Sequence, residues 1–149
     1  MFVRSWAALF GAAVLFCGPA VAQSHETTAA GYVLRSSSVQ SQRINADAAR
    51  KYGIEPAADR AVLNVVVLEA GPAQTTSPAK VSASRSNLAG MVQTVPLREV
   101  REGNRVSYIG DYTFLPKEVI RFRIEAEPAG HTGDPLLLEY EERMGATRR

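Results

Sequence analysis

Residues 119–127 read VIRFRIEAE, a stretch in which apolar and charged side chains alternate strictly from Ile120 onward. The apolar set is Ile120, Phe122, Ile124 and Ala126. Because successive side chains of a β-strand point to opposite faces, this pattern predicts a strand with one face in a core and the other in water.

Six further stretches have the length and composition of strands. They are residues 32–39, 61–69, 81–87, 92–101, 106–114 and 135–143. Residues 61–69 are apolar on both faces apart from Asn64, which indicates a central strand. The serines in 32–39 and 81–87 indicate edge strands.

A short helix is predicted to begin at Asn45 and end at Tyr52. Asn45 is a good N-cap, and Asp47 lies in the first turn, where the helix dipole favours an acid. Gly53 can adopt the left-handed conformation that often ends a helix.

Together these elements predict an all-β fold, an antiparallel immunoglobulin-like sandwich of about seven strands with one short helix. The Cys–Trp–Cys pattern of true immunoglobulin domains is absent from the sequence, so only the architecture is predicted. A small open barrel is the alternative.

Residues 95–114 are predicted to form a β-hairpin around Gly103-Asn104, a two-residue turn of type II′. This turn sets Glu102 opposite Arg105, whereas a three-residue loop would set Arg101 opposite Arg105. The charge pattern therefore favours the two-residue register, which extends to Leu97 opposite Gly110 and Val95 opposite Tyr112.

Residues 1–22 have the layout of a secretory signal peptide. Arg4 precedes an apolar run from Trp6 to Cys17, and small residues at 20–22 suit cleavage after Ala22. A retained anchor is the alternative, but the run is short of the roughly 20 apolar residues that span a membrane. We therefore expect a periplasmic protein, with a flexible lead over 23–31, one domain over 32–143 and a disordered tail over 144–149.

Cleavage would remove Cys17, the one cysteine, so the mature chain would have no disulfide and no thiolate. It would carry 16 basic and 15 acidic residues, since Arg4 is the one charged residue removed. This balance gives no electrostatic reason to expect nucleic acid as a partner. No second apolar run is long enough to span a membrane.

The hairpin carries the densest group of polar residues. The simpler interpretation is a solvated hairpin end with cross-strand ion pairs, each contributing about 0.2–1 kcal/mol. The functional alternative is a small polar pocket formed by Glu99, Arg101 and Tyr108, which requires Glu99 to be buried. No serine, cysteine or paired-carboxylate catalytic motif stands out, so no catalytic residue is predicted.

A mature chain that begins Gln23-Ser24-His25 has a histidine at its third position. The terminal amine, two backbone amides and the imidazole can form a square-planar site that suits Cu(II) or Ni(II). Cyclisation of Gln23 to pyroglutamate would remove the amine. No other cofactor is predicted.

The chain contains six short blocks in the order AARKYGI, LNVVVLE, NLAG, LREVREG, SYIGDY and EVIRFRIE. This order resembles that of a family of small exported bacterial proteins, the domain of unknown function 4426. The sequence resembles this family from Tyr32 to Glu142. The resemblance implies export and one β-rich domain, and it brings no assigned activity.

The first functional hypothesis is therefore a non-enzymatic periplasmic binding or assembly module. It would pair with a protein partner through an edge strand at 32–39 or 81–87. The alternatives are an enzyme with a polar site on the hairpin, or an N-terminal copper or nickel protein.

Overall fold

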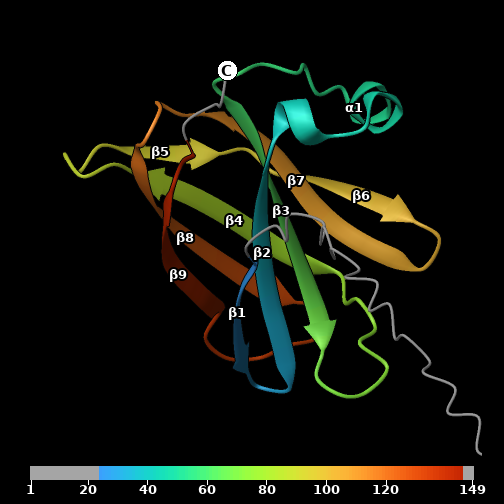
Figure 1. Cartoon of the computed structure of the whole chain (residues 1–149). Coiled ribbons are helices and arrows are strands. Elements are labelled where there is room, and N and C mark those ends of the chain that lie inside the picture. Colours follow the sequence, from blue (N-terminus) through green and yellow to red (C-terminus); the bar gives the residue numbers. More distant parts are fainter. Residues whose placement is uncertain (1–23, 146–149) are drawn as a thin grey trace, which may run out of the picture.

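The structure is a computed structural model that describes residues 24–145. Two antiparallel sheets lie face to face and enclose the core (Figure 1). The predicted signal peptide, Gln23 and residues 146–149 lie outside the described residues. The predicted β-sandwich with one short helix is confirmed, with nine strands in the described part of the chain where about seven were expected.

The first sheet has the strand order β1-β2-β3-β7-β6. Its strands are β1 (Ser24–Ala29), β2 (Tyr32–Gln40), β3 (Arg60–Glu69), β7 (Arg105–Thr113) and β6 (Arg98–Glu102). β3 is the central strand, as predicted, and both of its faces are largely buried.

The second sheet has the strand order β5-β4-β8-β9. Its strands are β5 (Val92–Val95), β4 (Ala79–Ser86), β8 (Val119–Pro128) and β9 (Leu136–Arg143). The alternation predicted for β8 is confirmed, because its apolar residues are buried in the core and its charged residues lie on the outer face.

The helical segments connect β2 to β3. They are the 3-10 turn η1 (Ser41–Arg43) and the helix α1 (Ala46–Tyr52). The predicted N-cap is confirmed, since the Asn45 side chain accepts a hydrogen bond of 2.8 Å from the Asp47 N–H. Gly53 ends the helix with a φ of 66°.

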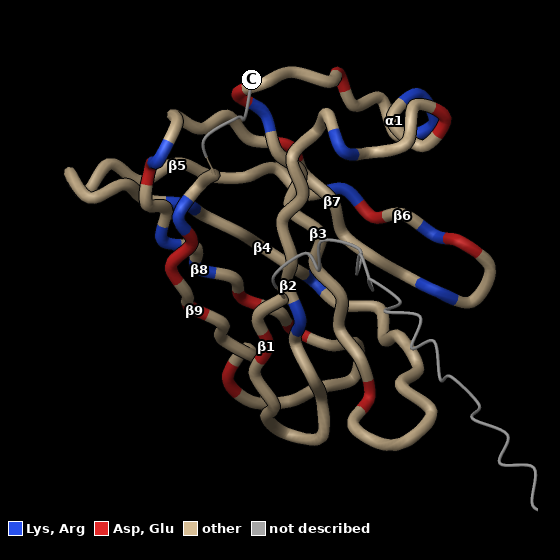
Figure 2. Tube along the Cα trace, in the orientation of Figure 1, with Lys and Arg blue, Asp and Glu red and all other residues tan. Residues whose placement is uncertain are grey.

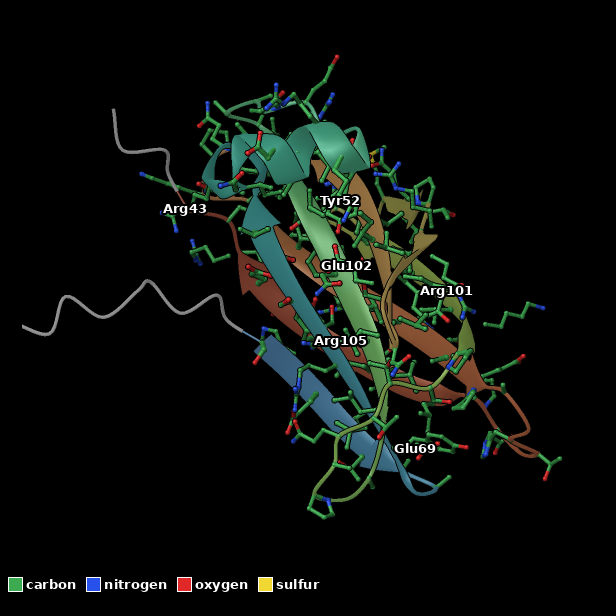
Figure 3. All side chains as sticks on the ribbon, turned by 90° about the vertical axis from the view of Figure 1, so that its right-hand side faces the viewer. Arg43, Tyr52, Glu69, Arg101, Glu102 and Arg105 are labelled. Carbon is green, nitrogen blue, oxygen red and sulfur yellow. The ribbon has the colours of Figure 1, made fainter. Side chains whose placement is uncertain are left out.

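α1 is attached to the edge of the first sheet by polar contacts. Tyr52 donates a hydrogen bond to Glu102 of β6, and Lys51 Nζ lies 3.1 Å from the same carboxylate. Figure 3 shows Tyr52 and Glu102 close together where the helix crosses this sheet. None of the described helices has both the length and the apolar character needed to cross a membrane.

The expectation of a flexible lead over 23–31 is wrong for Ser24–Ala29. This segment is β1, and it pairs with β2 from Ser24 opposite Ser37 to Ala29 opposite Tyr32. Backbone hydrogen bonds form the ladder whatever the side chains are, so a polar stretch can be a strand. Glu26 of β1 also forms a 2.9 Å ion pair with Arg35 of β2.

The expected disordered tail over 144–149 is wrong at its first residue. Met144 is buried in the core, and its N–H donates a 2.8 Å hydrogen bond to the Glu118 carbonyl. Its sulfur accepts a hydrogen bond from the Tyr112 hydroxyl at 3.8 Å. The domain therefore extends beyond 32–143 at both ends.

The expectation of one strand over 92–101 is also wrong. The segment forms β5 in one sheet and β6 in the other, and Val95 pairs with Ala83 rather than with Tyr112. Pro96 has no N–H for a ladder, so the chain leaves the second sheet there and enters the first.

Candidate functional site

The hairpin has the predicted register from its turn to Arg98 opposite Ile109, but the pairing of Val95 with Tyr112 is wrong. Glu102 lies opposite Arg105 and Glu99 opposite Tyr108. Gly103 has a φ of 58°, as a type II′ turn requires at its first position.

These residues do not form the polar pocket that the functional alternative needs. Glu99 and Arg101 bind each other at the surface, and the Glu99 side chain is 40% exposed. Tyr108 is buried, and its hydroxyl accepts a 2.7 Å hydrogen bond from the Ala79 N–H. A polar pocket on the hairpin requires a buried Glu99, so the structure does not support a functional site at these three residues.

The predicted metal residues meet at the start of β1. Ser24 and His25 lie in the ladder opposite Ser37 and Ser36, and Gln23 lies outside the described residues. A square-planar site uses the amide nitrogens of residues 24 and 25, so it would require the start of β1 to leave the sheet. Among residues 24–145, no group of three or more His, Cys, Asp or Glu could hold a metal ion. The N-terminal metal site stays a prediction.

The two segments predicted as edges are not edges. Residues 32–39 lie in β2, between β1 and β3, and residues 81–87 lie mostly in β4, between β5 and β8. Ser36 is fully buried and its hydroxyl lies 2.9 Å from that of Tyr140, so serine content did not indicate an open edge.

Four strands form the sheet edges, and they differ in how far they are protected. β1 lies against β9 where the two sheets meet, so these edges shield each other. β6 reads REVRE, and charged side chains on an edge disfavour pairing with another chain. β5 reads VQTV and carries no charge, so Figure 2 draws it in tan, without the blue or red of charged residues.

The ladder between β4 and β5 shows which backbone groups of β5 point outward. The Asn87 N–H donates a 3.2 Å hydrogen bond to the Met91 carbonyl, which makes this a hydrogen-bonded pair. Hydrogen-bonded and non-hydrogen-bonded pairs alternate along an antiparallel ladder. Gln93 and Val95 therefore bond to β4, while the N–H and C=O groups of Val92 and Thr94 point away from the sheet.

Apolar side chains gather at the tip of the β4–β5 hairpin. Leu88, Met91 and Val92 are 79%, 64% and 69% exposed. The tip is held by a 3.0 Å hydrogen bond from the Gly90 N–H to the Asn87 carbonyl and by another from the Met91 N–H to the Asn87 side chain. Since the turn is held by backbone and amide groups, its apolar side chains are free to contact another molecule.

A polar group lies inside the sandwich, between β2 and β9, and we call it the inner polar end. Its members are His25, Ser36, Ser38, Tyr112, Tyr140 and Glu142. The Ser36 and Tyr140 hydroxyls are 2.9 Å apart, and the His25 ring stacks on the Tyr140 ring at 3.9 Å.

Burial changes the acidity of this group. Loss of water around Tyr140 raises its pKa to about 12, and the contact with Ser36 opposes this in part. Burial also raises the pKa of Tyr112 and that of the Glu142 carboxyl. Ser38 lies beside all three groups and lowers each pKa, although its hydroxyl makes no hydrogen bond of standard geometry.

The phenol of Tyr140 is expected to make stability fall at alkaline pH. The folded state keeps the proton up to about pH 12, whereas the unfolded chain loses it near pH 10, so the free energy of unfolding falls as the pH rises through this range. In Tyr140→Phe, we expect a flatter dependence of the free energy of unfolding between about pH 10 and pH 12, and a loss of about 1 kcal/mol at neutral pH from the Ser36 contact. Denaturant titrations of both proteins at these pH values measure the effect. An identical alkaline slope in the variant would contradict this assignment.

The described chain is thus a two-sheet β-sandwich with one unprotected edge. The family model for a domain of unknown function (DUF4426) matches residues 26–144, and the chain belongs to this family. The resemblance seen in the sequence is confirmed.

Solved structures with the same fold are distant in sequence. A DUF4426 family protein from Pseudomonas aeruginosa PAO1 has a TM-score of 0.71 and 18% identity, over 84% of this chain and 97% of that one. FetP from uropathogenic Escherichia coli strain F11, expressed in the periplasm, has a TM-score of 0.63 and 13% identity, over 85% of this chain and 99% of that one. A copper-bound variant of FetP has a TM-score of 0.59 and 14% identity, over 81% of this chain and 97% of that one. None of the curated proteins matches this sequence significantly.

Proposed function

We propose that this protein is an exported, non-enzymatic binding module that captures an extended segment of a partner protein on the edge of β5. The observation that carries the proposal is the uncharged, exposed β5 edge, which ends in three exposed apolar side chains. The other three edges are charged or shielded by a neighbouring strand.

Strand addition uses the two kinds of group that β5 offers. The outward N–H and C=O groups of Val92 and Thr94 bind the backbone of the incoming segment, and this gives affinity without sequence preference. The apolar tip supplies the preference, because Leu88 and Met91 gain from contact with apolar side chains of the partner.

The chemistry of β5 indicates what kind of segment binds. Residues 87–97 contain no charged side chain, so a charged segment would lose water without gaining an ion pair. We therefore infer a partner segment that is extended, uncharged and apolar at alternate positions.

The compartment follows from the predicted signal peptide. Export to the periplasm is supported by the apolar run before Ala22 and by the likeness to FetP, which was expressed in that compartment.

We expect the protein in periplasmic fractions to begin at Gln23, as measured by mass spectrometry of the intact chain. A chain that still carries residues 1–22 would contradict cleavage.

The proposed edge is tested by a proline that removes one outward N–H. A photoreactive residue at Met91 should form an adduct with a partner protein in native periplasm. In Thr94→Pro, we expect the adduct yield to fall about tenfold, because one backbone donor is lost and the ring obstructs the approaching strand. Thr94→Val keeps the N–H and should retain the adduct.

The controls separate edge pairing from misfolding. Both variants should keep the circular dichroism spectrum of the parent, because Thr94 makes no ladder bond to β4. Equal adduct yields from the two variants would contradict strand addition. An adduct between two copies of this chain would contradict capture of a partner protein and would indicate self-association instead.

A further inference from the structure

The inner polar end contains buried polar atoms that have no partner. Four such side-chain atoms occur in the described part of the chain, and three of them belong to this group. They are His25 Nε2 of β1, Ser38 Oγ of β2 and Glu142 Oε2 of β9. The fourth, Arg60 Nε, lies 3.7 Å from Asp111 Oδ2 and away from this group.

A buried polar atom without a partner destabilises the folded protein, and a charged group does so more than a neutral one. Three of them in one group, from three different strands, indicate a place for a missing partner. Arg85 of β4 lies 5.8 Å from the centre of the ring of Tyr112, a member of this group, and donates a 2.6 Å hydrogen bond to Gln93, so its guanidinium is used by these two partners. Glu142 has no ion pair with any described residue.

The types of atom define the missing partner. An ionised carboxylate only accepts hydrogen bonds, and a hydroxyl and a neutral imidazole nitrogen can accept them as well. The partner is therefore a donor, and the Glu142 charge favours a cation. The rings of Tyr112 and Tyr140 lie beside the carboxylate, and aromatic rings attract cations.

The size and donor set narrow the choice among cations. All three atoms are closed to bulk water, so a small head group suits them better than a planar guanidinium. Glu142 and His25 are the only residues of the group with the side-chain types that most often bind transition metals, which is too few for a closed metal site. A primary ammonium group provides three N–H donors on one small cation.

We propose that the inner polar end binds a primary ammonium group, with Glu142 as its counter-ion and Ser38 as a neutral acceptor. Two sources have this chemistry. One is the α-ammonium that cleavage after Ala22 would create on Gln23, the residue directly before β1. The other is a free amine in the surroundings of the protein.

The first arm of the test compares two forms of the processed chain. One begins with free Gln23, and in the other this residue is cyclised to pyroglutamate, which lacks the ammonium. If the chain's own terminus binds, the free form should melt about 2–5 °C higher and its Glu142 carboxyl should titrate at lower pH. Both differences should vanish in Glu142→Gln.

The second arm adds methylammonium chloride to the cyclised form, with sodium chloride at the same ionic strength as the control. If a free amine binds, methylammonium should raise the melting temperature of the parent and leave that of Glu142→Gln unchanged. Tetramethylammonium, which has no N–H donor, should have no effect.

The proposal fails if neither arm gives a difference that depends on Glu142. It also fails if tetramethylammonium stabilises the protein as well as methylammonium, because the donors would then be irrelevant. Glu142→Gln keeps the size of the side chain, and Ser38→Ala provides a second variant, for which the same loss of effect is expected.

Discussion

Replacement of Phe122 by alanine is expected to lower the free energy of unfolding by about 3–5 kcal/mol. Phe122 is fully buried at the middle of β8. Its ring centroid lies 5.3 Å from that of Tyr112 and 5.2 Å from that of Tyr140, so it joins the apolar core to the inner polar end. Removal of the ring leaves a cavity that these neighbours cannot fill.

The matched control for Phe122→Ala is the next residue in the same strand. Arg123 points to the outer face and forms ion pairs with Glu125 and Glu139. Arg123→Ala should cost far less than Phe122→Ala, since its ion pairs are exposed. Denaturant titration of both variants measures the difference. Equal losses would contradict the assignment of inner and outer faces along β8.

The second large effect is expected from Gly110→Ala. A Cβ atom at this position would lie 2.2 Å from the Pro96 carbonyl oxygen, where the chain crosses between the sheets. Because the obstacle is backbone, it cannot move like a flexible side chain, and we expect a loss of about 3 kcal/mol. Thermal and denaturant unfolding of the variant measure this loss.

Gly145→Ala provides the control for this prediction. Its Cβ would meet only the Gln40 side chain, at 3.6 Å, which is ordinary contact distance. We expect a change within about 0.5 kcal/mol. A Gly110→Ala protein as stable as Gly145→Ala would show that the crossover does not approach β7 this closely.

The local patterns in the sequence predicted the local structure well. The alternation along β8, the Asn45 cap and the Gly103 turn each depend on a few neighbouring residues, and all three are confirmed. β1 was missed because the sequence SHETTA offers no apolar side to an alternation test, although its backbone pairs fully with β2.

The site was harder to predict because it depends on strand order. Whether Val92 and Thr94 face solvent is decided by the neighbours of β5, and these depend on the crossover at Pro96. One signal was available in the sequence, the lack of charge over residues 87–97. For the inner polar end, the signal was the position of Glu142, which lies two residues after the inward-facing Tyr140 and therefore on the same face of the strand.

Amide hydrogen exchange along β5 tests the central claim most directly. In the isolated protein, the Val92 and Thr94 amides should exchange fast and the Gln93 amide slowly, because of these three residues only Gln93 bonds to β4. Addition of the partner identified by crosslinking should slow Val92 and Thr94 and leave the β6 amides unchanged. Val92 and Thr94 amides that are already protected in the isolated protein, or that stay fast with the partner bound, would contradict capture of a strand on β5.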